Sequence, residues 1–154
     1  MTQCITLDAS LWHDCDAIYR HHQQACLRLQ DDHQVNVNLL LLALWLDRQT
    51  YFLSATQWRA LQQHTLEWDS QILTPYRKLR RLSKSSLADA QYQQMLTVEL
   101  MLERQSQTHI LQHLKRLTWQ GSDSNLTSYL ALFDLKAEQY TFLSSAPNAE
   151  PLKR

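Results

Sequence analysis

Apolar side chains fill eight consecutive positions at residues 39–46, which read LLLLALWL, and the run closes at Asp47 and Arg48. A helix that is apolar on every side must be surrounded by other elements. The run is rich in leucine and poor in β-branched residues, which favours a helix over a buried strand. We therefore predict a central helix over about 39–48, capped by Asn38, and we expect Asn36 and Asn38 to bind the backbone at its start.

Other segments repeat apolar residues at the spacing of a helix with one buried face. Polar turns, one of which holds the single glycine Gly121, separate them. Helices are expected over 10–30, 54–82, 87–119 and 126–143. With the central helix they predict an all-α, single-domain bundle of five or six helices over residues 1–143. Residues 144–154 hold two prolines and few apolar residues, which predicts a disordered tail. Aromatic residues are expected in the core: Trp12, Tyr19, Trp45, Trp68 and Tyr129.

The segment 54–82 contains a start signal and an interruption. Ser54 and Gln57 have the spacing of a capping box. Pro75 predicts a kink or a fresh helix start, because proline lacks a backbone donor and clashes with the preceding turn. Beyond the proline, the pattern directs apolar residues inward and basic residues outward: Tyr76, Leu79 and Leu82 to the core, and Arg77, Lys78 and Arg81 to solvent. The long helix over 87–119 is expected to bend or break near 105–107.

Composition excludes several function classes. One glycine in 154 residues cannot supply the glycine-rich dinucleotide or phosphate-binding motifs. Lys+Arg and Asp+Glu are both 15, so whole-molecule attraction to nucleic acid or to an anionic membrane is not indicated. Cys4, Cys15 and Cys26 lack metal-site spacing and are interpreted as small core residues. No signal peptide or membrane-spanning run is recognised, so a cytoplasmic protein is expected.

Two carboxylates one turn apart, Glu99 and Glu103, lie within the apolar stripe of the helix predicted over 87–119. Carboxylates in such a stripe are costly unless they are paired, hydrogen-bonded or protonated. The favoured interpretation is an ion-pair cluster with arginines, drawn from Arg77, Arg80, Arg81 and Arg20. Two alternatives stay open: a stripe turned partly to solvent, and a ligand or metal site in which Glu99 and Glu103 converge with Arg77, Arg80 or Arg81.

The residues at 77–84 include five basic side chains within eight positions: Arg77, Lys78, Arg80, Arg81 and Lys84. One interpretation is a contact with RNA or phosphate. The favoured one is a solvated basic face that balances nearby glutamates, because Tyr76 is the only aromatic residue close to it in the sequence.

Other polar constellations are incomplete. His109 and His113 share a helix face, but no strong third ligand lies within one turn. Asp31-Asp32 is followed by His33-Gln34-Val35, so the diphosphate-binding pattern DDxxD is not met. We therefore predict no catalytic residue, no metal site and no cofactor.

The chain resembles an uncharacterised family of small proteobacterial helical proteins, known by a placeholder domain name. The resemblance rests on ACLRLQD at 25–31, VNLLL at 37–41 and Trp45-Leu46, and it extends to Trp68, the segment 77–82 and the Glu99/Glu103 pair. Gln34 stands where that family usually has a glycine. The resemblance implies a bacterial, cytoplasmic, all-helical protein and supplies no activity.

Three functional hypotheses follow. The first is a non-enzymatic interaction or regulatory module with a protein partner or a second copy. The second is a small-ligand or metal-binding protein that uses Glu99, Glu103 and an arginine among Arg77, Arg80 and Arg81. The third is RNA or phosphate binding through residues 77–84. No membrane partner is expected.

Overall fold

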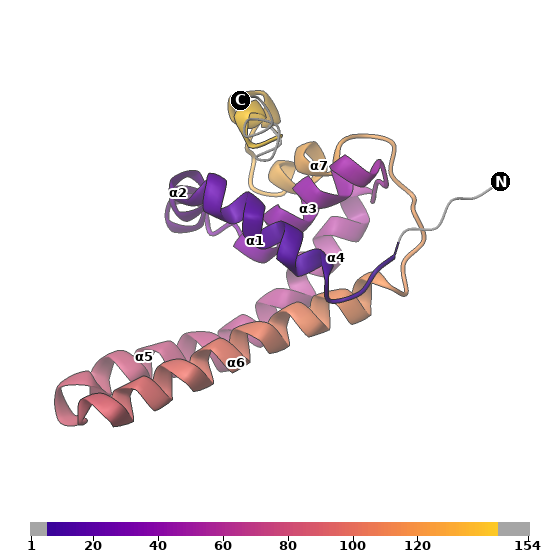
Figure 1. Ribbon diagram of the computed structural model, residues 1–154. Helices are drawn as coiled ribbons and strands as arrows, with labels where there is room; N and C mark the ends of the chain where they lie inside the picture. Colours follow the sequence, from indigo (N-terminus) through magenta and orange to yellow (C-terminus); the bar gives the residue numbers. More distant parts are fainter. Residues whose placement is uncertain (1–5, 145–154) are drawn as a thin grey trace, which may run out of the picture.

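A computed structural model describes residues 6–144, and every regular element among them is helical (Figure 1). The all-α prediction is confirmed, although the described part contains seven α-helices rather than five or six. They are α1 (Leu11–His21), α2 (Gln23–His33), α3 (Val37–Gln49), α4 (Ala55–Trp68), α5 (Thr74–Ser83), α6 (Asp89–Leu114) and α7 (Asn125–Ala131). Among these residues, no helix is at once long and apolar enough to cross a membrane.

Helix α3 is the hub of the fold. Every residue from Leu39 to Leu46 is buried, and α1, α2 and α7 pack around the helix. The cap is Asn36 rather than the predicted Asn38: its Oδ1 accepts a hydrogen bond of 3.0 Å from the backbone N–H of Leu39. Gln34, just before the cap, has φ 63°, the left-handed conformation that glycine adopts most easily. The position where relatives were expected to carry glycine thus has a glycine-like backbone.

The helix predicted over 10–30 is divided at His22, whose φ of −127° and ψ of 30° are not helical. A straight helix of that length would be about 30 Å long, against about 20 Å for α3. The break returns α2 to α3, so that Cys15 on α1 and Cys26 on α2 are both buried, as predicted. Cys4 lies outside the described residues.

Helices α5 and α6 form an arm that projects from the rest of the molecule, here called the body (Figure 1). Ser54 and Gln57 make the predicted capping box at the start of α4. Between α4 and α5 the chain makes a π-helical turn, η1 (Asp69–Leu73), and α5 starts afresh with Pro75 in its first turn. Helix α6 continues without the expected break near 105–107 and ends at Leu114, earlier than predicted.

The segment after α6 is tied to the body by close backbone contact. The N–H of Gly121 donates to the carbonyl of Phe52 at 3.0 Å. A Cβ on Gly121 would lie 2.2 Å from the carbonyl oxygen of Leu53, so only glycine fits there without a backbone shift. The sequence indicated a turn at this glycine, but not the close contact between its backbone and the backbone of residues 52–53.

Polar side chains fix the start of α7. Asp47 accepts hydrogen bonds from the backbone N–H groups of Asn125 at 2.6 Å and Leu126 at 3.2 Å. The buried side chain of Asn125 accepts from Leu53 N at 2.9 Å and Trp58 Nε1 at 3.0 Å, and donates to the Tyr51 carbonyl at 2.7 Å. These bonds join three segments of the body.

The helix predicted over 126–143 is wrong in its length. Helix α7 ends at Ala131, Asp134 has φ 59°, and a 3₁₀ segment, η3 (Ala137–Ser144), follows. The turn allows Leu143 to return to the core, where it is fully buried. Of the predicted core aromatics, Trp12, Trp45 and Tyr129 are buried, whereas Tyr19 and Trp68 are partly exposed. Apart from Ser144, the predicted tail lies outside the described residues.

Candidate functional site

An ion-pair cluster occupies the seam between α5 and α6. Arg77 Nε donates to Glu99 Oε2 at 3.1 Å, and Arg77 Nη2 donates to Glu103 Oε2 at 2.7 Å. Arg80 Nε also donates to Glu99, and Arg80 Nη1 donates to the Tyr92 hydroxyl at 3.0 Å. Two arginines therefore bind Glu99 at a position between the two helices where a leucine would normally pack. The structure agrees with the favoured interpretation of the carboxylate pair.

The cluster keeps Glu99 ionised. Burial acts to raise the pKa of Glu99, but hydrogen bonds and charge from Arg80 and Arg77 outweigh it and hold the pKa below its usual value. Only 12% of the Glu99 side chain is exposed. Two arginines donate three hydrogen bonds to the Glu99 carboxylate, and these bonds join α5 to α6 and give Glu99 and Arg80 a structural role in the arm.

The two leucines of α5 do not face inward as predicted. Leu79 is 53% exposed and Leu82 is 69% exposed, whereas Arg77 and Arg80 point into the seam. The arm consists of two helices, so α5 has one neighbour and one covered face. Arginines that pair with the carboxylates of α6 occupy that face, and the leucines are left on the flank. Arg81 is exposed and lies outside the cluster.

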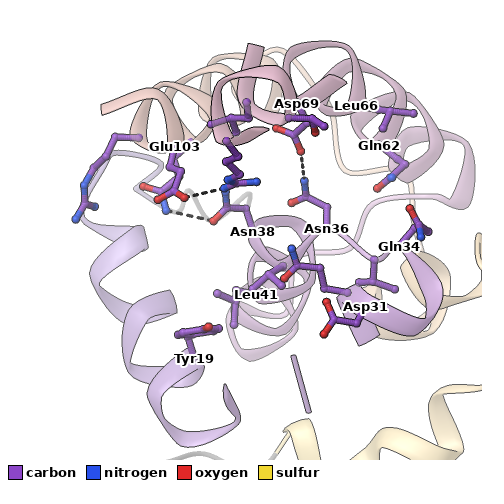
Figure 2. A pocket seen from close by; sticks show the side chains of 18 of the residues that line it. Tyr19, Asp31, Gln34, Asn36, Asn38, Leu41, Gln62, Leu66, Asp69 and Glu103 are labelled. Atoms are coloured by element: carbon purple, nitrogen blue, oxygen red, sulfur yellow. Dashed lines mark hydrogen bonds and ion pairs between the residues drawn. The ribbon is translucent and has the colours of Figure 1, made fainter. Parts of the chain in front are cut away.

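A cleft of about 650 Å³ lies between the arm and the body (Figure 2). Its volume is within the range of small-molecule sites, about 300–1,000 Å³. Residues from four parts of the chain line it. They are Asp16, Tyr19, Gln30 and Asp31 of α1 and α2; Gln34, Val35, Asn36, Val37, Asn38 and Leu41; Gln62, Leu66, Asp69, Leu73, Thr74 and Arg77; and Leu100, Glu103, Arg104 and Gln107 of α6.

Hydrogen bonds hold several of the lining side chains in place. Asn36 Nδ2 donates to Asp69 Oδ2 at 2.9 Å, which joins the α2–α3 loop to the π-helical turn. Gln107 Nε2 donates to Asn38 Oδ1 at 3.2 Å, which joins α6 to α3. Gln62 Oε1 accepts the hydroxyl hydrogen of Tyr129 at 2.7 Å. The polar walls are thus oriented by contacts within the protein.

Asp69 is the most unusual group in the cleft. Its Oδ2 accepts from Asn36, but its Oδ1 is buried and has no hydrogen-bond partner among the described residues. Burial raises the pKa of Asp69, against the opposing charge of Arg77 and the hydrogen bond from Asn36. The residue begins the π-helical turn, a conformation that is frequent at functional sites. A buried acceptor without a donor is costly in a structural position.

The structure divides the residues predicted for a site. Glu103 and Arg77 line the cleft, Glu99 and Arg80 lie in the arm seam, and Arg81 is in solvent. Sequence reasoning missed Asp69, because nothing in its local sequence predicts a π-helical turn. Asn36 and Asn38 were expected only to bind the backbone at the start of the central helix. Asn36 does so and also contacts Asp69, whereas the side chain of Asn38 accepts from Gln107. The segments that carry the family resemblance supply much of the lining, including Gln30, Asp31, Val37 and Asn38.

The predicted histidine pair lies elsewhere, in a hollow of about 390 Å³. The ring of His113 lies 5.0 Å from that of His64, and His109 packs edge-on against Trp68 at 4.8 Å. Burial and the neighbouring charge of His64 lower the pKa of His113. Within residues 6–144, no group of three or more His, Cys, Asp or Glu is placed to hold a metal ion.

The flank of the arm that faces away from the cleft is apolar. Ile72 of η1 and Leu79 and Leu82 of α5 follow helical spacing, as do Val98 and Met101 on α6. All five are exposed, from 36% for Ile72 to 69% for Leu82. The residues of α5 and α6 that line the cleft lie on the other flank of the arm; they include Thr74, Arg77, Leu100 and Arg104. These five side chains are called the apolar arm face below.

Comparison with protein-family models matches residues 10–110, a span from α1 to the last turns of α6 that includes the described residues of the cleft. The search of curated proteins and the search of solved structures found no match. The matching model covers more than half of the chain and is described as "Protein of unknown function (DUF2390)"; the chain belongs to that family.

Proposed function

We propose that this chain is a non-enzymatic binding protein and that the cleft between arm and body binds a small polar ligand. The observation that carries the proposal is a cleft of about 650 Å³ whose amide and carboxylate groups are already oriented by hydrogen bonds. Sites for small molecules combine such a concave shape with a few fixed polar groups and apolar walls. Here Leu41, Leu66 and Leu100 contribute the apolar part.

The two described cysteines give no support to an enzyme with a thiol nucleophile. Burial raises the pKa of Cys26 to about 11, and it also raises the pKa of Cys15. Both thiols are therefore protonated at neutral pH and unreactive. Neither cysteine lines the cleft. A cytoplasmic location stays a prediction from the sequence.

A pair of substitutions on α6 tests the cleft. Leu100 lines it, whereas Thr97 is exposed one turn earlier and does not. Leu100→Trp should fill part of the cleft, and Thr97→Trp serves as the matched control. Thermal-shift screening of amines, amino acids, carboxylates, sugars and nucleotides should find ligands that stabilise the wild type and Thr97→Trp but not Leu100→Trp. If no compound stabilises the wild type, or if Leu100→Trp responds equally, the cleft is not the site.

The apolar arm face supports a second candidate, an interaction module whose partner is a second copy of this chain. Its five large side chains are uncharged, and Gln94 and Gln105 follow the same flank of α6 at helical spacing. Two such arms placed face to face would complete a four-helix bundle and would not repel each other. A strongly charged partner would find no opposite charge among these seven residues.

Sedimentation measures this association directly. The double variant Leu79→Gln/Met101→Gln removes apolar surface from the apolar arm face, and Leu100→Gln removes a similar exposed side chain from the opposite flank. We expect a concentration-dependent dimer for the wild type and Leu100→Gln and a monomer for the double variant. A wild-type monomer at 100 µM, or a dimer insensitive to the double variant, would refute the pairing; about 100 µM is far above the dissociation constants of stable dimers.

RNA or phosphate binding through residues 77–84 receives less support. Arg77 and Arg80 are engaged by Glu99 and Glu103, and Lys84 lies over the ring of Tyr92 at 5.4 Å. Lys78 and Arg81 are left as the exposed cations outside these contacts. A phosphate backbone is usually held by a larger basic surface.

A further inference from the structure

The lining of the cleft carries more negative than positive charge. Asp16, Asp31, Asp69 and Glu103 line it together with two cations, Arg77 and Arg104. The whole chain has a formal net charge of zero, so this excess of two negative charges is a local property. Concave sites lined by one sign of charge concentrate ligands of the opposite sign.

One of the two lining arginines, Arg77, does little to offset this excess. Arg77 donates to Glu103 and also to Glu99, which lies behind the lining. Its charge is therefore shared between two carboxylates. An anionic ligand would have to compete with these carboxylates for Arg77 while facing Asp69 and Asp31. A phosphate or a dicarboxylate fits this arrangement poorly.

The carboxylates stand on different walls. Asp31 belongs to α2, Asp69 to η1 and Glu103 to α6, and Figure 2 shows Asp31 across the opening from Asp69 and Glu103. The apolar side chains Leu41, Leu66 and Leu100 also line the cleft. A flexible ligand with cationic groups at both ends and an aliphatic chain between them offers partners to the carboxylates and to these apolar side chains.

One buried acceptor among the lining residues of the cleft lacks a donor. Asp69 Oδ1 is buried without a hydrogen-bond partner among the described residues, and an ammonium group offers three donors and no acceptor. Tyr19 also lines the cleft and adds an aromatic ring of the kind that attracts organic cations. Both features favour a cation over a neutral sugar or an anion.

We propose that the ligand of the cleft is an aliphatic di- or polyamine, bound with its ammonium groups at Asp31 on one wall and at Asp69 and Glu103 on the other. This inference rests on the proposed function and names its ligand class. It predicts that binding depends on carboxylates from two walls at once, because each holds a different nitrogen of the same molecule.

Isothermal titration with spermidine at physiological ionic strength tests the inference, with glutamate and inorganic phosphate as probes of opposite charge. Asp31→Asn removes one lining charge, and Asp32→Asn, at the exposed neighbouring position outside the cleft, is the matched control. Loss of an exposed charge pair should weaken spermidine binding about fivefold in Asp31→Asn. Loss of a buried charged acceptor should weaken it at least about tenfold in Asp69→Asn. Asp32→Asn should leave the affinity within about twofold.

The outcomes separate this inference from the proposed function. Binding of a neutral or anionic compound that Leu100→Trp abolishes, without binding of spermidine, would leave the cleft a ligand site and overturn the amine assignment. Spermidine binding that Asp31→Asn and Asp32→Asn weaken equally would indicate general attraction to acidic surface and would also overturn it. Failure of every compound in the wild type would remove the proposed function itself. Circular dichroism of Asp31→Asn and Asp69→Asn checks that both variants are folded.

Discussion

The body and the arm bury opposite kinds of side chain. In the body, residues Leu39–Leu46 of α3 are buried, and leucines and aromatic rings of the neighbouring helices pack against them. In the arm, the seam between α5 and α6 contains Arg77, Arg80 and Glu99, while Leu79 and Leu82 lie outside. The same residue type therefore has a different role in the two regions. The number of neighbouring helices decides which face of a helix is covered.

Polar groups also differ between the regions. In the body, Asn125 is neutral, fully buried, and satisfied by three hydrogen bonds to distant segments. In the arm, the polar groups are charged and partly exposed. Removing a buried neutral side chain leaves its hydrogen-bond partners unsatisfied, whereas water can replace part of a partly exposed ion pair. Stability should therefore respond far more strongly to changes in the body.

Asn125→Ala should give the largest effect. It leaves the N–H of Leu53, the indole N–H of Trp58 and the carbonyl of Tyr51 without the side chain that pairs them. We expect the free energy of unfolding to fall by about 3–5 kcal/mol, since each buried unsatisfied group costs about 1–3 kcal/mol. Urea denaturation measures it, and Thr127→Ala, exposed on the same helix, is the control. A loss below about 1 kcal/mol would mean that water enters the site freely.

A leucine-to-alanine substitution in each region compares how much one leucine contributes to the free energy of unfolding in the body and in the arm. Leu42 is fully buried in α3, and Leu82 is 69% exposed on α5. Leu42→Ala should cost about 2–5 kcal/mol of unfolding free energy through lost burial and a cavity. Leu82→Ala should stay within about 0.5 kcal/mol. Chemical denaturation of both variants at one dilute protein concentration makes the comparison, and equal losses would show that the arm leucine is covered in solution.

Glu99→Gln should have a smaller effect that is confined to the arm. The amide keeps the shape of the side chain but weakens its bonds to Arg77 and Arg80. We expect a loss of about 1 kcal/mol in unfolding free energy, a value discounted for solvent screening. Hydrogen exchange should show faster opening of α5, with α3 unchanged. Protection lost equally in both helices would indicate that arm and body unfold together.

The effect of Glu99→Gln should depend on pH. The pKa of Glu99 in the folded protein lies below the usual 4.5, so the folded state favours the ionised form. This contribution to stability is fully present above pH 4.5 and is lost as the pH falls through the lower folded pKa. Unfolding curves of the wild type and Glu99→Gln should therefore converge at acidic pH. Glu67→Gln, at an exposed position, controls for general charge effects.

Patterns that depend on near neighbours in the chain were predicted well. The apolar run at 39–46, the capping box at Ser54 and the new helix start at Pro75 are all in the structure, because caps, proline and continuous apolar runs act within a few residues. The ion-pair cluster of Glu99 was also foreseen, since a carboxylate in an apolar stripe requires a partner.

The predictions that failed required knowledge of distant neighbours. The break at His22 lets α2 pack against α3, and the outward leucines of α5 reflect that, among the described residues, α6 is the one α-helix that packs along α5. The Asp69 site depends on Asn36, thirty-three positions away in sequence.

Sequence alone therefore determined that this protein is helical and that one leucine-rich helix lies at its centre, because those properties come from residue type and periodicity along the chain. The choice of buried face on α5, the cleft and the unpaired oxygen of Asp69 were decided by the tertiary structure. A helix has several possible faces, and only the elements that pack beside it settle which of them is removed from water.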